Sequence, residues 1–346
     1  MLPLPTCPAA QWGHAMNRFA AAALLALAPF AAMADEKPKL TVYTYDSFVS
    51  EWGPGPKVEA AFEETCDCDL ELVAAGDGAA LLGRVRLEGR RSDADIVLGL
   101  DANLVAKARE TGLFAEHGLD LPENAVPGGW EDDTFVPYDW GHFAFVYDET
   151  RLDEPPASFE DLRDAPEDVT IVIQDPRTST PGLGLLLWVK HVYGDEAGAV
   201  WADLAPRIVT VTKGWWEAYS AFLEGEAAMA LSYTTSPAYH VIAEEDGTKR
   251  AAAFDEGHYM QIEVAGKLAN TDAPDLADDF LKFMTGEGFQ SVIPTTNWMY
   301  PAYPAGDLPE AFGDLVEPSK SLIFAPEDTP EVRDAALAEW LEALSR

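Results

Sequence analysis

Apolar residues along this chain follow two alternating patterns, which predict strands separated by helices. Short runs rich in β-branched and aromatic residues occur at 40–45, 69–73 and 94–100, a length typical of strands. Between these runs, apolar residues recur at helical spacing, as they do from 81 to 87. The alternation of strand and helix predicts a doubly wound α/β unit in the first part of the chain.

The alternation continues in the second part of the chain. The aromatic and β-branched segment 135–147 predicts one or two long strands. Further strands are predicted at 170–173, 208–211, 228–233 and 258–264, and helices at 158–163, 197–204, 217–223, 274–284, 288–292 and 330–344. We expect loops at 234–240 and 294–301, where proline, threonine and serine interrupt the pattern.

The stretch 169–194 reads as a strand, a turn and a helix. Ser179 is a typical helix N-cap residue, and Pro181 suits the first helical position. Gly182 and Gly184 carry no side chain, so a ligand could approach the backbone closely there. Free backbone amides at a helix start can bind an anion. An ordinary capped helix after a strand explains the same residues.

Composition and charge narrow the possible functions. The chain has 346 residues, of which 48% are hydrophobic, so it can bury a large core and suggests two domains. Its net charge is −37, which makes a nucleic-acid partner unfavourable because phosphate is repelled. Such an acidic excess also keeps an exported protein soluble.

The N-terminus has the pattern of a secretory signal peptide. Arg18 precedes a small apolar run from 19 to 32, and Ala32-Met33-Ala34 resembles a small-x-small cleavage site. The run is too short to span a bilayer. Residues 1–15 carry no positive charge and fit no targeting pattern, which leaves Met16 as an alternative start.

Only two cysteines follow the predicted cleavage site. Cys66 and Cys68 are separated by one residue, and export favours a disulfide between them. We interpret the pair as a small structural or redox-labile bridge that adds little chain-entropy stabilisation. No further metal ligands lie close to it in the sequence.

Common catalytic motifs are absent, whereas aromatic residues recur where predicted strands end. No H-E-x-x-H, G-x-x-x-x-G-K-[ST], G-x-S-x-G or G-x-G-x-x-G occurs, and the histidines show no metal-ligand spacing. Aromatic faces near Gly, Ser and Asp can hold a flat heterocycle or a cation. The aromatic residues in question are Tyr45, Trp215, Tyr233, Tyr239 and Trp298.

Asp77 has two possible roles. It lies between Gly76 and Gly78 just before a helical pattern, so it could be a helix N-cap. It would also lie at the ligand-binding edge of the predicted sheet, where a carboxylate could balance the charge of a buried organic cation.

Several long motifs resemble the periplasmic thiamine-binding proteins of ABC importers. The resemblance spans nearly all of the chain after the predicted cleavage site, including the cysteine pair C-D-C. It rests on T-V-Y-T-Y-D-S-F at 41–48, W-G-P-G-P at 52–56, A-D-I-V-L-G-L-D at 94–101, Q-D-P-R-T-S-T-P-G-L-G-L-L-L-W at 174–188, V-T-K-G-W at 211–215, L-S-Y-T-T-S-P-A-Y-H at 231–240 and I-P-T-T-N-W-M-Y-P at 293–301.

This resemblance implies an α/β fold of the two-lobed type II periplasmic-binding-protein class. Each lobe would be a doubly wound sheet, with the ligand cleft between the lobes. The expected organisation is a signal peptide at 1–34, lobe 1 at 35–140, lobe 2 at 141–260, and a return to lobe 1 with C-terminal helices at 261–346. The protein is expected to be a periplasmic monomer without enzymatic activity.

The resemblance also implies a ligand and the residues that bind it. Thiamine, thiamine phosphate and thiamine diphosphate would be captured and delivered to the membrane permease of an ABC importer, with no cofactor, metal or nucleic acid. Trp215 and Trp298 would flank the aromatic rings of the ligand. Tyr45, Tyr233 and Tyr239 would complete the cage, Asp77 would pair with the aminopyrimidine or the thiazolium, and Ser179 and Gly182 would take the hydroxyethyl or phosphate end.

Two alternatives remain open at this point. A protein of the same fold could bind ferric iron or a polyamine, although iron has no use for two sandwiching indoles. A thiaminase-like enzyme would instead use a cysteine nucleophile, and Cys66 and Cys68 are the only candidates. If these two cysteines are paired, neither can serve.

Overall fold

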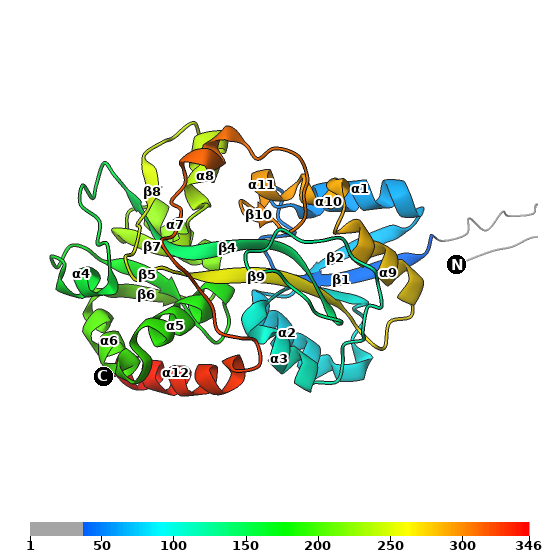
Figure 1. Cartoon of the computed structure of the whole chain (residues 1–346), viewed down its shortest axis with the longest axis horizontal. Helices are drawn as coiled ribbons and strands as arrows, with labels where there is room; N and C mark the ends of the chain where they lie inside the picture. The colour runs from blue at the N-terminus through cyan, green and yellow to red at the C-terminus, as the bar shows by residue number, and fades with distance from the viewer. Residues whose placement is uncertain (1–36, 346) are drawn as a thin grey trace, which may run out of the picture. The chain divides into compact units, whose positions relative to one another are not determined.

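The computed structural model describes residues 37–345, which form one compact unit (Figure 1). The predicted signal peptide at 1–34 lies outside the described residues. Within 37–345, no helix is both long enough and apolar enough to cross a membrane.

The first three strands are parallel and alternate with helices, as predicted. They pair in the order β2–β1–β3, which places β1 between the other two. All of β3 is buried, as expected for a strand covered on both faces. These elements are β1 (Lys39–Thr44), α1 (Gly55–Cys66), β2 (Asp69–Ala74), α2 (Gly78–Glu88), β3 (Ile96–Asp101) and α3 (Ala102–Glu110).

Two long antiparallel strands connect the two ends of the sheet. They are β4 (Phe135–Asp148) and β9 (His258–Lys267). The first half of β4 pairs with β9, and its second half pairs with β7 (Met229–Tyr233). With β5 (Ile171–Gln174) and β6 (Ile208–Thr212), the order of the eight main strands is β2–β1–β3–β9–β4–β7–β5–β6. The single predicted stretch 135–147 is thus one strand, which belongs to both ends of the sheet.

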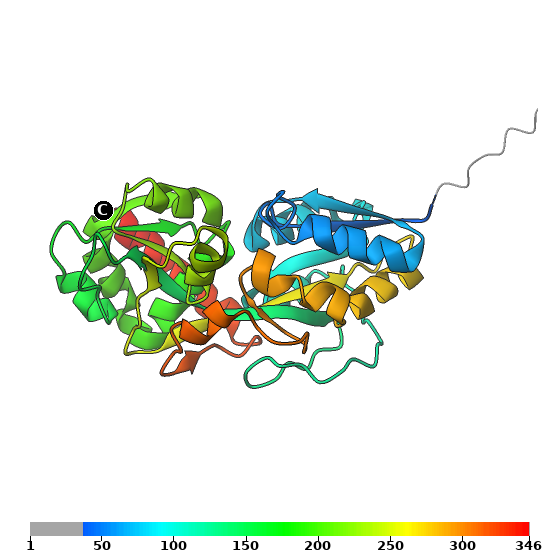
Figure 2. The same ribbon diagram turned by 90° about the horizontal axis from the view of Figure 1, so that it is seen from above.

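The second end of the sheet repeats the α/β alternation. The central strand β5 pairs in parallel with β6 and β7, and helices pack around it (Figures 1 and 2). The elements are α4 (Phe159–Asp164), β5 (Ile171–Gln174), α5 (Thr180–Tyr193), α6 (Ala197–Leu204), β6 (Ile208–Thr212), α7 (Trp215–Leu223), β7 (Met229–Tyr233), α8 (Ser236–Ala243) and β8 (Lys249–Ala251).

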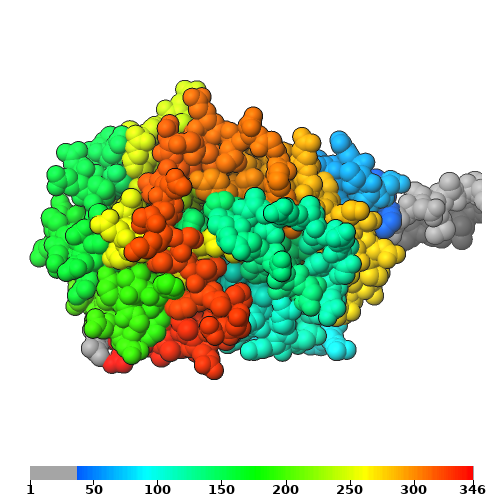
Figure 3. All heavy atoms as spheres, in the orientation of Figure 1, coloured from blue at the N-terminus to red at the C-terminus, as the bar shows by residue number. Residues whose placement is uncertain are grey.

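The C-terminal region contacts both ends of the sheet. Helix α9 (Pro274–Phe283) packs on α1 and β9, and α12 (Thr329–Leu344) packs on α3, α5 and α6. Figure 3 shows the orange and red C-terminal residues lying on this face between green residues of the second end and cyan residues of the first. The other elements here are α10 (Glu287–Gln290), α11 (Ile293–Thr296), β10 (Tyr300–Pro301) and β11 (Ser321–Leu322).

Two stretches expected to be loops contain regular structure. Segment 234–240 enters helix α8, with Pro237 in its first turn, where the missing backbone N–H costs nothing. Segment 294–301 contains most of α11 and the short strand β10, and Pro294 again falls in the first turn of its helix. Proline at these positions starts a helix, so the expectation of loops was wrong for 236–240 and 294–296, whereas residues 297–299 are irregular.

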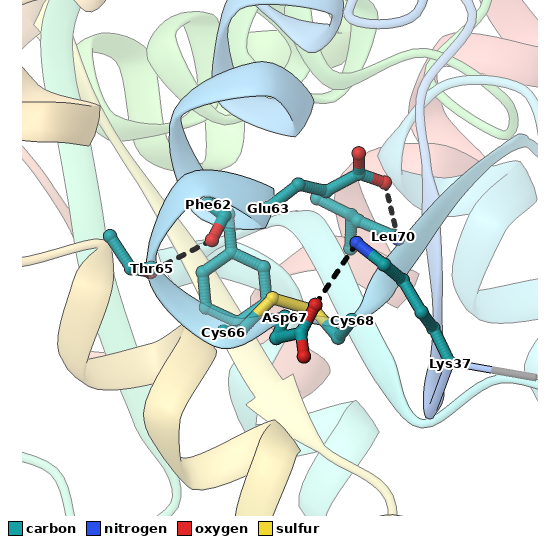
Figure 4. Close-up of a disulfide and its surroundings, with 8 residues drawn as sticks. All are labelled: Lys37, Phe62, Glu63, Thr65, Cys66, Asp67, Cys68 and Leu70. Atoms are coloured by element: carbon teal, nitrogen blue, oxygen red, sulfur yellow. Dashed lines mark hydrogen bonds and ion pairs between the residues drawn. A yellow bond between two sulfur atoms is a disulfide. The ribbon is translucent and has the colours of Figure 1, made fainter. Parts of the chain in front are cut away.

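The cysteine pair forms a disulfide at the junction of α1 and β2 (Figure 4). The Cα atoms of Cys66 and Cys68 are 5.1 Å apart. Asp67 between them has a φ of 49°, in the left-handed region, which turns the chain back within one residue. Its carboxylate lies 3.2 Å from Lys37 Nζ. The bridge therefore fixes the tight turn from helix to strand.

Candidate ligand-binding site

A cavity of about 190 Å³ opens between segments from the two ends of the sheet. Side chains that follow β1 and precede α2 line one side, and side chains at the starts of α5, α7 and α8 line the other. Residues of β9 and of the segment after α11 complete the wall. The lining residues are Tyr45, Ser47, Trp52, Asp77, Gly78, Thr180, Pro181, Trp215, Trp216, Tyr219, Tyr233, Ser236, Tyr239, Gln261, Glu263, Thr296, Asn297, Trp298 and Met299.

The walls of the cavity are largely aromatic, and several rings hold one another in place. Trp215 stacks on Tyr219, with ring centroids 5.1 Å apart, and its indole N–H donates to Ser232 Oγ at 2.8 Å. Tyr239 meets Trp298 edge to face at 5.3 Å. A ligand would therefore find flat faces that are already fixed by packing, which limits the entropy lost on binding.

Local chain geometry places the two predicted indoles. Trp215 is the first residue of α7, directly after Gly214, so its backbone N–H has no partner within the helix. Trp298 follows the end of α11 and has a φ of 58°, a conformation uncommon for a bulky residue. Its backbone N–H donates to Ile293 O at 3.0 Å, which closes the end of the helix. Such strained positions concentrate at ligand sites.

Asp77 connects three helix starts at one end of the cavity. It occupies the N-cap position of α2, yet its side chain makes no capping bond there. Instead, Asp77 Oδ2 accepts from Ser179 Oγ at 2.8 Å and from the backbone N–H of Trp215 at 3.2 Å. Burial raises the pKa of Asp77 to about 6, although both hydrogen bonds oppose the shift. The carboxylate therefore faces the cavity from the starts of α5 and α7.

Glu263 supplies a second carboxylate in a different part of the wall. It lies on β9 two residues after Gln261, so both side chains reach the same face of the strand. Glu263 Oε2 accepts from Tyr138 Oη at 2.8 Å and from Tyr45 Oη at 3.0 Å. Asp139, on the neighbouring strand β4, is the register partner of Glu263.

The charged side chains among the described residues that line the cavity are all acidic. Among the described residues that line it, two are carboxylates and none is a lysine or an arginine. Within residues 37–345, no group of three or more His, Cys, Asp or Glu side chains is arranged to hold a metal ion. An aromatic wall combined with carboxylates favours a flat organic cation over an anion.

The structure brings together six of the eight ligand-binding residues predicted from sequence. Tyr45, Asp77, Trp215, Tyr233, Tyr239 and Trp298 all line the cavity. Ser179 and Gly182 do not: Ser179 is fully buried and donates to Asp77, and a Cβ on Gly182 would lie 2.5 Å from Gln174 O. Ser179 thus orients the carboxylate of Asp77, and the neighbouring residues Thr180 and Pro181 line the cavity.

Among the lining residues that were not predicted from sequence, two aromatic and two polar side chains bear most on the ligand. Trp52 belongs to the W-G-P-G-P motif, which could have signalled it. Trp216 directly follows Trp215, and the sequence alone does not decide which of these two indoles faces the cleft; in the structure both line the cavity. Glu263 and Gln261 lie inside an apolar run that reads as an ordinary strand. A charged residue within a buried strand needs a partner or a function, so the presence of Glu263 in this apolar run could have indicated a functional residue.

A mixed α/β unit with one aromatic cavity between the ends of a continuous sheet defines a two-lobed ligand-binding protein. The chain matches the family described as bacterial extracellular solute-binding protein over residues 54–291, and it belongs to that family. The predicted fold class is thereby confirmed. Members of this family bind solutes and are not enzymes, so the thiaminase-like alternative does not hold. Cys66 and Cys68 are moreover joined to each other and do not line the cavity.

Curated and solved relatives cover nearly the whole chain. A thiamine-binding periplasmic protein of Salmonella typhimurium is 54% identical over 316 residues, which are 91% of this chain and 96% of the relative. A solved periplasmic thiamin binding protein is also 54% identical, with a TM-score of 0.88, over 90% of this chain and 97% of that chain.

An iron-binding protein of the same fold is much more distant. Iron-bound HitA from Pseudomonas aeruginosa is 20% identical, with a TM-score of 0.70, over 88% of this chain and 99% of that chain. A likeness at this level of identity concerns the fold alone, so it does not favour iron as the ligand.

Proposed function

We propose that the protein captures thiamine in the periplasm and delivers it to the membrane permease of an ABC importer. The observation that carries this proposal is 54% identity, over nine-tenths of the chain, to relatives named as thiamine-binding.

The chemistry of the cavity supports the same ligand. Thiamine has a flat aminopyrimidine ring and a permanently positive thiazolium ring. The indoles of Trp215 and Trp298 offer faces for both rings, with each aromatic or cation contact contributing about 0.5–2 kcal/mol. Asp77 and Glu263 offer negative charge, and no lining lysine or arginine opposes the cation.

Thiamine phosphate and thiamine diphosphate are proposed as further ligands. The starts of α2, α5 and α7 meet near Asp77, and helix starts attract anions. The carboxylate of Asp77 already accepts the hydrogen bonds available from Ser179 and Trp215. A phosphate would have to share this place with a carboxylate, so we expect unphosphorylated thiamine to bind at least as tightly.

Three further expectations accompany the proposal. The protein acts as a monomer, it needs no cofactor, and its permease recognises the ligand-bound form. Closure of the two ends around the ligand is the natural mechanism, because β4 and β9 are the strands that join them.

Titration calorimetry tests the ligand. The chain beginning at Asp35 is titrated with thiamine, its two phosphate esters, ferric citrate and spermidine. We expect one-to-one binding of thiamine and no heat with ferric citrate or spermidine. Absence of binding to thiamine, together with binding of iron or polyamine, would overturn the proposal while leaving the fold unaffected.

A further inference from the structure

Glu263 is a buried carboxylate on the cavity wall, and it forms no ion pair with any residue of the described range 37–345. Its side chain is only 5% exposed, and this exposed part faces the cavity. Two tyrosine hydroxyls, those of Tyr45 and Tyr138, donate to the same oxygen, Oε2. Hydrogen bonds donated to a carboxylate favour its ionised form, so both tyrosines stabilise the negative charge of Glu263.

The neighbouring carboxyl group, that of Asp139, is uncharged. Asp139 is fully buried, and Asn297 Nδ2 donates to its Oδ2 at 2.6 Å. Its other oxygen, Oδ1, receives no hydrogen bond. Burial and the charge of Glu263 both raise the pKa of Asp139 well above its usual range, so Asp139 keeps its proton. The pair therefore carries one charge, on the member that faces the cavity.

In the described part of the chain, the titratable groups that interact most strongly with Glu263 are acidic or phenolic. Asp101 is its register partner on β3, on the side opposite Asp139. These groups are Tyr45 after β1, Asp101 on β3, Tyr138 and Asp139 on β4, and Tyr233 on β7. Among the described residues, neither the hydrogen-bond donors to Glu263 nor its register partners on β3 and β4 include a lysine or an arginine. A buried charge without a partner is costly, and a bound cation would remove that cost.

We propose that Glu263 is the counter-charge of the bound cation, and that a proton on Glu263 blocks capture in acid while ligand binding expels it. Asp139 and Tyr138, which do not touch the cavity, act as positioning residues that keep Glu263 ionised. This inference rests on the proposed function, because it takes the ligand to be an organic cation. It differs from the sequence-based prediction, which gave that role to Asp77.

The sign of the pH dependence follows from the burial of Glu263. Burial raises the pKa of Glu263 to about 7, against the two tyrosine hydrogen bonds. Above this pH the residue is negative and attracts the cation. As the pH falls through about 7, Glu263 gains a proton and the attraction is lost. If only the ionised form binds, the affinity for thiamine falls about ten-fold between pH 8 and pH 6.

Calorimetry of the whole exported chain tests the assignment. Thiamine binding is measured at pH about 8 and about 6, each in two buffers with different heats of ionisation, so that proton release is counted. For the wild type we expect the ten-fold fall and the release of more than half a proton at the lower pH. For Glu263→Gln we expect weaker binding at pH 8, a flat pH profile and no proton release.

Three further variants separate Glu263 from the other carboxylates and from a loss of folding. Asp77→Asn and Asp101→Asn each remove a carboxyl whose pKa burial raises to about 6, and both should keep the proton release. Tyr138→Phe removes one donor from Glu263 without touching the ligand, so it should move the loss of affinity to higher pH. Circular dichroism of each variant verifies the fold.

The outcomes distinguish this inference from the proposed function. Wild-type protein that fails to bind thiamine contradicts the function itself. Wild-type protein that binds thiamine equally well at both pH values, or proton release that survives in Glu263→Gln and disappears in Asp77→Asn, overturns the assignment of Glu263. An uncharged analogue with a thiophene in place of the thiazolium should bind with no proton release, and release with this analogue also contradicts the assignment.

Discussion

The indole of Trp52 lies against the indole of Trp216, with ring centroids 5.2 Å apart, across the mouth of the cavity. Trp52 follows β1 at one end of the sheet, and Trp216 belongs to α7 at the other. Both are nearly half exposed, at 45% and 46%. Their contact joins the two ends where a ligand would enter and leave.

Trp52→Ala should therefore speed the release of ligand. The lost aromatic contact is worth about 0.5–1.5 kcal/mol, so we expect dissociation to be roughly two- to twelve-fold faster. Stopped-flow fluorescence during dilution of the thiamine complex measures this rate. Trp52→Phe keeps a ring and should lie between the variant and the wild type. An unchanged rate in Trp52→Ala would show that the contact does not hold the mouth closed.

Trp215→Ala and Trp298→Ala should weaken thiamine binding without unfolding the protein. Both side chains are only partly buried in the cavity wall, and each offers a ring face worth about 0.5–2 kcal/mol to a bound aromatic or cationic ring. Affinity by calorimetry and melting temperature by circular dichroism separate the two effects.

A tryptophan of the core provides the contrast for these variants. Trp201 is 1% exposed and does not line the cavity. Trp201→Ala should cost about 3–5 kcal/mol of stability, because it leaves a large void. If Trp215→Ala or Trp298→Ala lowered the melting temperature as much as this variant does, their role would be in packing and not in binding.

His258 should stay neutral at pH values below the usual pKa of histidine. It is fully buried, its Nε2 accepts from the backbone N–H of Phe254 at 3.0 Å, and its Nδ1 lies 2.7 Å from Phe143 O. Since Nε2 must accept, the proton resides on Nδ1 and is donated to Phe143. Burial lowers the pKa of His258, although the bond to Phe143 opposes this shift.

The lowered pKa of His258 determines the direction in which the stability of the fold depends on pH. A histidine whose pKa is lower in the folded state contributes stability above the unfolded pKa of about 6.5, and this contribution is lost as the pH falls below it. NMR of 15N-labelled histidine should show the Nδ1–H tautomer and no titration of His258 near pH 6.5. Titration at that pH would contradict the buried, doubly bonded arrangement.

Local pattern predicted the elements and most of the cavity, because both leave local signals. The continuous apolar run at 94–100 gave β3, and aromatic residues in expected turns and loops gave Trp215 and Trp298. Ser179 was expected at the ligand, but its hydroxyl is satisfied by Asp77, which lies 102 residues away in sequence. A partner at that distance cannot be read from a local pattern.

Glu263 was missed for a related physical reason. The environment of its carboxylate is formed by Tyr45, Tyr138 and Asp139, which come close to it only when β9 pairs with β3 and β4. In the sequence it is one acidic residue within an apolar run. Only the order of the strands in the sheet places this carboxylate on the wall of the cavity.

Removing the disulfide should have little effect on binding. The bridge between Cys66 and Cys68 encloses one residue and lies outside the cavity. The chain-entropy model gives about 1–2 kcal/mol for so short a loop. Urea unfolding of the Cys66→Ala/Cys68→Ala double variant should show a loss of this size, with thiamine affinity unchanged. A large loss of affinity would mean that the turn controls the cavity.

Gly182→Ala should destabilise the fold without any ligand being involved. A Cβ at this position would lie 2.5 Å from the backbone oxygen of Gln174, which neither β5 nor α5 can move easily. Such overpacking costs about 1–3 kcal/mol. Gly83→Ala is the matched control: Gly83 lies within α2, a Cβ there meets nothing within 4 Å, and alanine should stabilise the helix by about 0.5–1 kcal/mol. Urea unfolding of both variants in the absence of ligand provides the comparison. If Gly182→Ala kept wild-type stability and lost only thiamine affinity, Gly182 would serve the ligand, as first predicted from sequence, and not the packing of α5 on β5.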